Sequence, residues 1–177
     1  MERYYISARG DSGGYLLEVR ELDGSDPAMI AELSELDLLT YSEPTFSRYT
    51  LGAFMSHGRV FTIHADGLLI GACHCMRPWD SPDEVVLFNM ALRPGWRGHG
   101  LGTRFLYRVL ERLQGRGTRA VTLMVSTLSS RAIAVYRTKF GFEQVGWLAD
   151  PYGTGLPYLK FRLDLTRPLA PILNEGG

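Results

Sequence analysis

The sequence has no excess of charge of either sign and no long apolar run. Basic and acidic residues number 19 each among the 177 residues, so the formal net charge at pH 7 is zero. A balanced charge provides no field that would recruit nucleic acid or an anionic membrane surface. No apolar stretch approaches the roughly 18 residues that a membrane-spanning helix requires, and the first residues contain no signal-peptide core. These absences predict a soluble, cytoplasmic protein without nucleic-acid or membrane partners.

Cysteine is also scarce. The two cysteines, Cys73 and Cys75, flank His74. A Cys-His-Cys run could suggest a metal site, but no second group of ligands follows at the spacing that zinc sites use. On a strand the two thiols share one face, and buried reduced thiols are typical of a reducing compartment. We therefore predict no metal site.

The length suits a single domain with a substantial core. We expect this domain to span residues 15–165, after a leader or marginal strand at 1–14 and before a tail at 166–177. The hydrophobic patterns predict an α/β fold with a mixed, strongly twisted sheet of about seven strands and helices on both faces. The expected strands are residues 15–22, 59–65, 68–76, 85–92, 120–127, 143–148 and 156–165.

Two helices are expected between the first two of these strands. Asp26 and Pro27 mark the start of the first helix, as an N-cap followed by proline at the first helical position. The second helix is expected after residues 42–44, with an apolar stripe of Phe46, Tyr49 and Ala53. The connection at residues 38–43 is rich in apolar and aromatic residues, and it either caps the core or lines a substrate cleft.

The stretch with the most specific pattern runs from residue 85 to residue 114. A near-continuous apolar run, residues 85–92, predicts a buried strand, and apolar residues recur at helical spacing from Leu101 onward. A glycine-rich loop, residues 97–103, joins the two. The start of a helix offers unpaired backbone N–H groups and a positive dipole, and glycines let a phosphate approach the backbone. The stretch therefore predicts a phosphate-binding loop.

Three kinds of phosphate loop compete for this stretch. A P-loop needs Lys followed by Ser or Thr after its last glycine, which Thr103-Arg104 does not supply. A dinucleotide fingerprint needs glycine in place of Thr103 and an acidic residue at the end of the next strand, which is absent. The pattern Arg-x-x-Gly-x-Gly is met by Arg97, Gly100 and Gly102. This pattern resembles the pyrophosphate loop of the GNAT acyltransferase superfamily, although a glycine-rich helix start can also be only a tight turn.

A second segment, residues 129–142, resembles the GNAT segment Asn-x-x-Ala-x-x-x-Tyr-x-x-x-Gly-Phe. Ala132 and Tyr136 are in register with it, Ser129 stands where the family often has Asn, and Gly141-Phe142 comes one residue later than the pattern asks. An aromatic residue on a helix face is by default part of the core. The resemblance instead makes Tyr136 a candidate general acid that protonates the leaving thiolate of CoA.

The resemblance implies acetyl-CoA as cosubstrate, entering a splay between the strands at 85–92 and 120–127. Backbone groups of residues 90–92 would pair with the pantetheine, and amides of the loop would hold the pyrophosphate with added charge from Arg97. The residues implied for cofactor binding are Met90, Ala91, Leu92, Arg97, Gly98, His99, Gly100, Leu101, Gly102, Thr103, Ser129 and Tyr136.

Within the superfamily the chain is most similar to the ribosomal-protein-alanine N-acetyltransferases (RimI-type). The segment 87–92 resembles their strand before the loop, and Ser42-Glu43-x-x-Phe46 and Tyr152 loosely resemble their substrate side. This implies direct acetyl transfer to a peptide N-terminal amine. A small amine (polyamine, aminoglycoside or amino acid) and a non-catalytic acyl-CoA-binding module remain alternatives. The residues expected at the acceptor are Tyr41, Glu43, Met124 and Tyr152.

One departure from the family concerns the general base. The family carries Leu-Glu-Val on the strand after the loop helix, and this chain carries Leu123-Met124-Val125. Methionine cannot accept a proton. An α-amine with a pKa near 8 is already partly neutral at pH 7, so a carboxylate acting through water would suffice. Glu84 is our first candidate for this base, ahead of Asp83 and Glu43, although each is by default a solvated charge.

Overall fold

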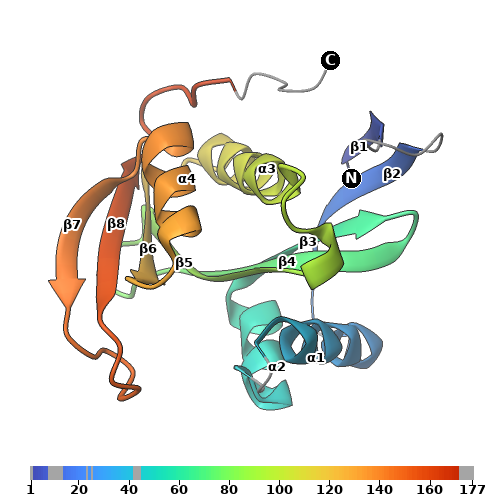
Figure 1. The fold of residues 1–177 in the computed structure, drawn as a ribbon, viewed down its shortest axis with the longest axis horizontal. Helices are drawn as coiled ribbons and strands as arrows, with labels where there is room; N and C mark the ends of the chain where they lie inside the picture. Colours follow the sequence, from blue (N-terminus) through green and yellow to red (C-terminus); the bar gives the residue numbers. More distant parts are fainter. Residues whose placement is uncertain (1, 8–13, 23, 25, 42–44, 172–177) are drawn as a thin grey trace. The chain divides into compact units, whose positions relative to one another are not determined.

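The computed structural model describes residues 2–7, 14–22, 24, 26–41 and 45–171 (Figure 1). The chain forms two compact units. The first comprises Met1–Met76 and Asn89–Phe105, and the second comprises Arg77–Phe88 and Leu106–Gly177. Strand β5 (Glu84–Leu92) and helix α3 (Leu101–Gly115) each contribute residues to both units.

The first unit contains an antiparallel meander. Strands β1 (Glu2–Ser7), β2 (Gly14–Glu21), β3 (Arg59–Ala65) and β4 (Leu68–Met76) follow one another in the sheet, and the C-terminal part of β5 comes next. The described residues form eight strands, one more than expected, and the additional strand is β1, within the segment expected to be a leader or a marginal strand. Asp66 and Gly67 join β3 to β4 with φ angles of 46° and 85°, the positive values that a tight hairpin turn requires.

Helix α1 (Pro27–Tyr41) begins as the sequence predicts, because the Ala28 N–H donates to Oδ1 of Asp26 at 2.9 Å. The helix runs through Tyr41. The connection expected at residues 38–43 was therefore predicted to start too early. Leu38, Leu39 and Tyr41 are between 42% and 48% exposed. These side chains lie on the last turn of a helix and do not cap the core.

Helix α2 (Arg48–His57) starts at Ser47, whose hydroxyl accepts a hydrogen bond from the Thr50 N–H. The expected apolar stripe is wrong in part, because Tyr49 is 93% exposed and Ala53 is exposed. The buried side chains of α2 are those of Leu51, Phe54 and Met55. A helix that starts at Arg48 turns these three positions inward, and Phe46 is buried just before the helix.

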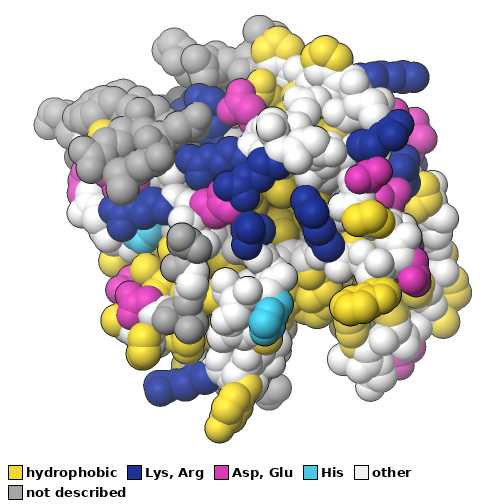
Figure 2. Space-filling view, turned by 180° about the vertical axis from the view of Figure 1, so that it is seen from behind, with side chains coloured by type: hydrophobic (Ala, Val, Ile, Leu, Met, Phe, Trp, Pro, Cys, Tyr) yellow, Lys and Arg dark blue, Asp and Glu magenta, His cyan; other side chains and the backbone are white. Residues whose placement is uncertain are grey.

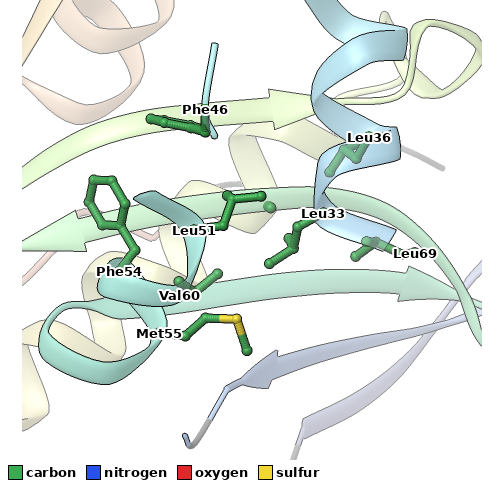
Figure 3. Packing of buried hydrophobic residues seen from close by; sticks show 9 residues of the cluster. Leu33, Leu36, Phe46, Leu51, Phe54, Met55, Val60 and Leu69 are labelled. Carbon is green, nitrogen blue, oxygen red and sulfur yellow. The ribbon is translucent and has the colours of Figure 1, made fainter. Parts of the chain in front are cut away.

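Helices α1 and α2 cover one face of β3 and β4 (Figures 1 and 3). Their apolar side chains interlock with those of the strands in one cluster. Asp37, which is buried, accepts hydrogen bonds from the N–H groups of Thr45 and Phe46 and thereby holds the approach to α2. The buried cluster consists of Leu33, Leu36, Phe46, Leu51, Phe54, Met55, Val60, Leu69 and Ala72.

The start of α3 lies on the opposite face of the first unit's sheet. Gly102 contacts Leu92 of β5, and Leu92 in turn lies beside Gly71 and Ile63. Ile63 points away from the face on which Val60 packs, because successive residues of a strand alternate between faces. The first unit thus carries helices on both faces of its sheet, as expected.

The second unit contains parallel and antiparallel pairs. The N-terminal part of β5 pairs with β6 (Ala120–Ser126) in parallel, from Glu84↔Ala120 to Leu87↔Leu123. Strand β8 (Tyr158–Asp164) pairs antiparallel with β6 and with the edge strand β7 (Glu143–Leu148), which gives the order β5-β6-β8-β7. Helix α4 (Ser130–Phe140) ends at Gly141, whose φ of 73° is the left-handed conformation of a helix stop. The mixed α/β sheet is therefore confirmed.

One face of the second unit's sheet is buried and the other is open. Leu123 and Phe161, which are paired across β6 and β8, are at most 2% exposed. On the opposite face, Met124 and Ser126 are half-buried and Lys160 is exposed. None of the described helices is both long enough and apolar enough to cross a membrane.

Candidate functional site

The loop between β5 and α3 presents a row of free backbone N–H groups. Within the described part of the chain, no N–H group from Gly98 to Thr103 donates a hydrogen bond, and the first that does is Arg104, to the Gly100 carbonyl at 3.1 Å. The first turn of a helix has no intrahelical acceptors for its N–H groups, and the helix dipole adds positive potential at this end. This arrangement suits a phosphate or pyrophosphate group.

Two contacts hold this loop in place. Residues Pro94–Trp96 form a short 3-10 turn (η1), and the Trp96 ring packs edge-on against Tyr15 of β2, with ring centroids 4.8 Å apart. Next to the turn, Nε of Arg97 donates to the Leu92 carbonyl at 2.9 Å. Arg97 and His99 are exposed, so their side chains can supply charge or hydrogen bonds to a bound anion.

Glycine stands at different positions of the loop for different structural reasons. Gly100 has a φ of +74°, and a Cβ added there would meet no atom within 4 Å. Glycine is favoured here by the positive φ, and the space beside the backbone is open. At Gly102 a Cβ would lie 3.2 Å from Cδ1 of Leu92, so this glycine lets the helix start pack closely against β5. Gly98 also has a positive φ, of 93°.

The other residues expected at the cofactor lie next to this loop or in the second unit. Ala91 is buried, Met90 and Leu92 are half-buried at the end of β5, and Leu101 is buried at the start of α3. In the second unit, Ser129 is the residue before α4, and its side chain makes no capping hydrogen bond.

Tyr136 lies on α4 and is half-buried. Its ring packs edge-on against Phe142, with centroids 5.6 Å apart. The extra residue before Gly141-Phe142 is accommodated by the left-handed Gly141, whose N–H bonds back into the helix. The phenol ring therefore has a packing role beside any chemical role.

Met124 lies on the open face of β6. Residues directly opposite each other on paired strands share a face. The neighbour of Met124 on β8 is Lys160. Met124 shares its face with Thr122, which is buried, and with Ser126, whereas Leu123 and Val125 are buried on the other face.

Tyr152 lies in the loop between β7 and β8 and packs edge-on against Tyr158, with ring centroids 5.0 Å apart. Partial burial, and to a lesser extent the neighbouring Tyr158, raise the pKa of Tyr152. The carboxylate of Asp150 accepts hydrogen bonds from the N–H groups of Thr154 and Gly155 at 2.8 and 3.0 Å. These bonds give the loop a defined shape that positions Tyr152.

The candidates for the general base differ in surroundings. Oε1 of Glu84 forms an ion pair with Arg162 at 2.9 Å, at the start of β5 beside Ala120. Glu84 is thus level with a residue four positions before Met124 on β6, which corresponds to about 13 Å along a strand. Asp83 is exposed, and Glu43 lies outside the described residues. An ion pair gives Glu84 a structural role that the sequence does not reveal.

Two contacts of the expected acceptor side were not foreseen. The Tyr41 hydroxyl donates to Oδ1 of Asn89 at 2.6 Å, which joins the end of α1 to β5 within the first unit. The second is the placement of Lys160 opposite Met124. Neither contact has a local sequence signal, since both depend on which strands and helices become neighbours. The described residues also contain no group of three or more His, Cys, Asp or Glu side chains that could hold a metal ion.

The chain has recognisable relatives. The family model of the acetyltransferase (GNAT) family matches residues 27–142. The [ribosomal protein bS18]-alanine N-acetyltransferase of Escherichia coli (strain K12) is 36% identical over 72 residues, which cover 41% of this chain and 48% of that protein. The L-2,4-diaminobutyric acid acetyltransferase of Nocardia farcinica is 30% identical over 80 residues, covering 45% and 41%. The matches thus span about half the length of these relatives or less.

Solved structures show the same fold. The crystal structure of the ribosomal-protein-S18-alanine N-acetyltransferase from Escherichia coli has a TM-score of 0.74 at 19% identity, covering 86% of this chain and 96% of that one. The NatC complex bound to Gag peptide and CoA contains a chain with a TM-score of 0.71 at 18% identity, covering 84% and 98%. The match over residues 27–142 confirms the resemblance found in the two glycine-containing motifs, and the chain belongs to the acetyltransferase (GNAT) family.

Proposed function

We propose that the protein transfers the acetyl group of acetyl-CoA to a primary amine, and that this amine is the N-terminus of a protein or peptide. The observation that carries the proposal is the loop from Arg97 to Thr103, in which the N–H groups from Gly98 to Thr103 are free at the start of α3. A pyrophosphate is the group of acetyl-CoA that such a loop would hold. The CoA in the NatC complex and the membership in an acetyltransferase family support the same cosubstrate.

The proposed reaction is direct transfer in a ternary complex. Acetyl-CoA supplies an activated acyl group: the amine nitrogen attacks the thioester carbonyl, a C–N bond forms, the C–S bond breaks, and the amine loses a proton while the thiolate gains one. Backbone groups of Met90, Ala91 and Leu92 would bind the pantetheine, with Ser129 adding a hydroxyl at the start of α4. Tyr136 would hold or protonate the thiolate, because a phenol with a pKa near 10 can donate to it.

The acceptor side has no carboxylate at position 124. We propose that the amine reacts from its neutral form and that water or a more distant carboxylate takes its proton. Glu84 stays a candidate for that carboxylate, although its ion pair with Arg162 and its place level with Ala120 favour a structural role. Tyr41, Met124 and Tyr152 would line the acceptor, and Glu43 is proposed on the sequence alone.

A peptide acceptor is favoured by the relative that acts on a ribosomal-protein alanine and by the peptide in the NatC complex. The second candidate is a small amine, which the similarity to a diaminobutyric acid acetyltransferase supports. A non-catalytic acyl-CoA-binding module is the third, because the carboxylate of the family's proposed base is missing.

One experiment separates the three candidates. The purified protein is incubated with acetyl-CoA and with separate pools of peptides and small amines, and the free thiol released is measured over time. Acetylated peptides identified by mass spectrometry would support the proposal, and turnover of small amines alone would favour the second candidate. Binding of acetyl-CoA by calorimetry without thiol release on any pool would favour the module.

A further inference from the structure

The open face of the second unit carries three cross-strand rows. In an antiparallel pair, residues directly opposite each other lie on one face with Cβ atoms about 4.5–5.5 Å apart. The register of β6, β8 and β7 therefore groups the side chains into rows that run across the three strands. The rows are Thr122, Arg162 and Glu143; Met124, Lys160 and Gly146; and Ser126, Tyr158 and Leu148.

The middle row contains a cation without a counter-ion. Arg162, in the neighbouring row, forms an ion pair with Glu84 at 2.9 Å. Lys160 lies between Met124 and Gly146, which carry no charge, and within the described residues it makes no ion pair and no side-chain hydrogen bond. It is exposed, and it is one of only two lysines among the 19 basic residues of the chain.

Strand β7 leaves room for the side chain of Lys160 at Gly146. A Cβ added to Gly146 would lie 3.4 Å from Cβ and 4.0 Å from Cδ of Lys160, so the aliphatic stem leans over this glycine of β7, on the side of β8 away from β6. A stem that packs on a strand keeps its ammonium group on that face of the sheet. The ammonium of Lys160 therefore stays on the face that Met124 shares, on the β7 side of that face.

We propose that Lys160 binds a carboxylate of the acceptor, so that the preferred acceptor is a peptide with Asp or Glu close to its N-terminal amine. The inference rests on the proposed function, because it takes the face around Met124 as the acceptor side. With methionine at position 124, the middle row carries one positive charge and no negative one. Such a row attracts an anionic peptide and disfavours a cationic one.

The same charge would assist the chemistry. A nearby cation disfavours the protonated form of an amine and so increases the fraction of the acceptor that is neutral and nucleophilic. The aromatic rings of Tyr158 and Tyr152 adjoin the middle row on the side of the β7–β8 loop and extend the surface along which a peptide can lie. A peptide chain is therefore the occupant that we assign to this face.

The test uses pairs of peptides with an N-terminal alanine that differ only in Glu or Gln at position 2, 3 or 4. With the full chain and saturating acetyl-CoA, we expect kcat/KM to be about fivefold higher for Glu at one of these positions, as for a partly exposed ion pair worth about 1 kcal/mol. The preference should fall in 0.5 M salt, because salt screens exposed charges. Lys160→Met should abolish it, and Lys160→Glu should reverse it in favour of a peptide with Lys at that position.

Lys139→Met provides the matched control, since Lys139 is the chain's other lysine and is exposed on α4. It should keep the preference for Glu, and thermal unfolding should show that each variant is folded. Equal kcat/KM for Glu and Gln peptides in the wild type would overturn the inference and leave the proposed function intact. A preference that survives Lys160→Met would overturn the assignment to Lys160. Acetylation of small acidic amines alone would overturn the assignment of a peptide as the acceptor. Absence of thiol release with every amine would overturn both proposals.

Discussion

The central strands of the two units are buried to different extents. In the first unit, β3 and β4 are buried on both faces, and every residue from Val60 to Ala65 and from Leu69 to Cys75 is buried. In the second unit, β6 and β8 are buried on one face, and the other face is partly exposed at Met124, Ser126, Tyr158 and Lys160, although Thr122 on that face is buried. A strand with two buried faces is constrained by packing, whereas a strand with an open face can change its side chains to suit a ligand.

Polar side chains show the consequence of this difference. His74 of β4 is 3% exposed between the rings of Phe46 and Phe54, and neither ring nitrogen has a hydrogen-bond partner in the described structure. Lys160 of β8 is equally without a partner but is exposed to solvent. The first arrangement lowers stability when the group becomes charged, and the second leaves a charge available for binding.

The largest effect that we expect is a loss of affinity for acetyl-CoA on changing the loop at residues 97–103. This loop belongs to the first unit but lies outside its buried strands. Gly100→Val would place a branched side chain in the open space beside the free N–H groups. We expect affinity for acetyl-CoA to fall about a hundredfold, equivalent to about 2.7 kcal/mol. Isothermal titration calorimetry measures this loss directly.

A positive φ also makes valine strained at this position, by about 1–2 kcal/mol. Gly117→Val is the matched control, because Gly117 has a φ of +80°, likewise meets no atom within 4 Å, and lies at the other end of α3. It should lower the unfolding midpoint to a similar degree and leave affinity unchanged. Unchanged affinity in folded Gly100→Val would mean that the loop does not hold the pyrophosphate.

The second prediction tests the buried strands of the first unit. Burial lowers the pKa of His74 from 6.5 to about 4. Between these values the unfolded chain binds a proton that the native protein does not, so the free energy of unfolding should fall as pH falls from 6.5 to 4. The slope contributed by His74 is about 1.4 kcal/mol per pH unit, and His74→Leu should remove it. Urea unfolding at several pH values measures the slope.

His64 should contribute in the same direction, because burial and the neighbouring Arg20 lower its pKa to about 4 as well. The wild-type slope should therefore fall in His74→Leu without disappearing. A slope unaffected by His74→Leu would show that His74 is not held neutral by burial.

In the second unit we expect changes in turnover without changes in stability. Tyr136→Phe keeps the ring that packs against Phe142 and removes the hydroxyl. Turnover should fall at least about tenfold, while affinity for acetyl-CoA changes little, since the proton donor to the thiolate is lost. Tyr107→Phe on α3 is the control and should keep wild-type turnover. Wild-type turnover in Tyr136→Phe would return Tyr136 to a packing role alone.

The smallest effect concerns the open face itself. The rate of the wild type should rise with pH toward the pKa of the acceptor amine, because no carboxylate stands at position 124. Met124→Glu should raise kcat/KM about threefold at pH 6 for a neutral peptide and make the pH profile flatter, whereas Met124→Gln should do neither. The new carboxylate would also face Lys160, so the preference for acidic peptides should weaken.

A pH profile unchanged by Met124→Glu would place the base elsewhere. Glu84→Gln would then be the next variant to measure. Because Glu84 is ion-paired with Arg162, its replacement should be judged by turnover and by the unfolding midpoint together. A lower midpoint with normal turnover would assign Glu84 to the fold.

The glycine-rich loop at residues 97–103 and most element types could be predicted from the sequence because their signals are local. The spacing of Arg97, Gly100 and Gly102, the cap at Asp26 and the stop at Gly141 each involve a few neighbouring residues. The membership in the family followed from two such local patterns and is confirmed.

What could not be predicted depends on partners that are distant in the sequence. The position of Lys160 opposite Met124 follows from the register of β6 and β8, and a shift by one residue would place Lys160 on the other face. The exposure of Tyr49 depends on where α2 begins against the sheet, and the ion pair of Glu84 joins residues that are 78 positions apart. Basic and acidic side chains are interspersed in Figure 2, so pairing of this kind cannot be inferred from a count of charges.

Trp96, which packs against Tyr15, is a fluorescent side chain next to the loop at residues 97–103. The chain has three tryptophans, and the other two, Trp79 and Trp147, are 98% and 61% exposed. Their indole emission is therefore already that of a ring in water. Trp96 is half-buried one residue before Arg97, so it is the indole whose surroundings a ligand at the loop would change. Occupancy of the loop can thus be followed by intrinsic fluorescence in the unlabelled protein, and Trp96→Phe should abolish the change.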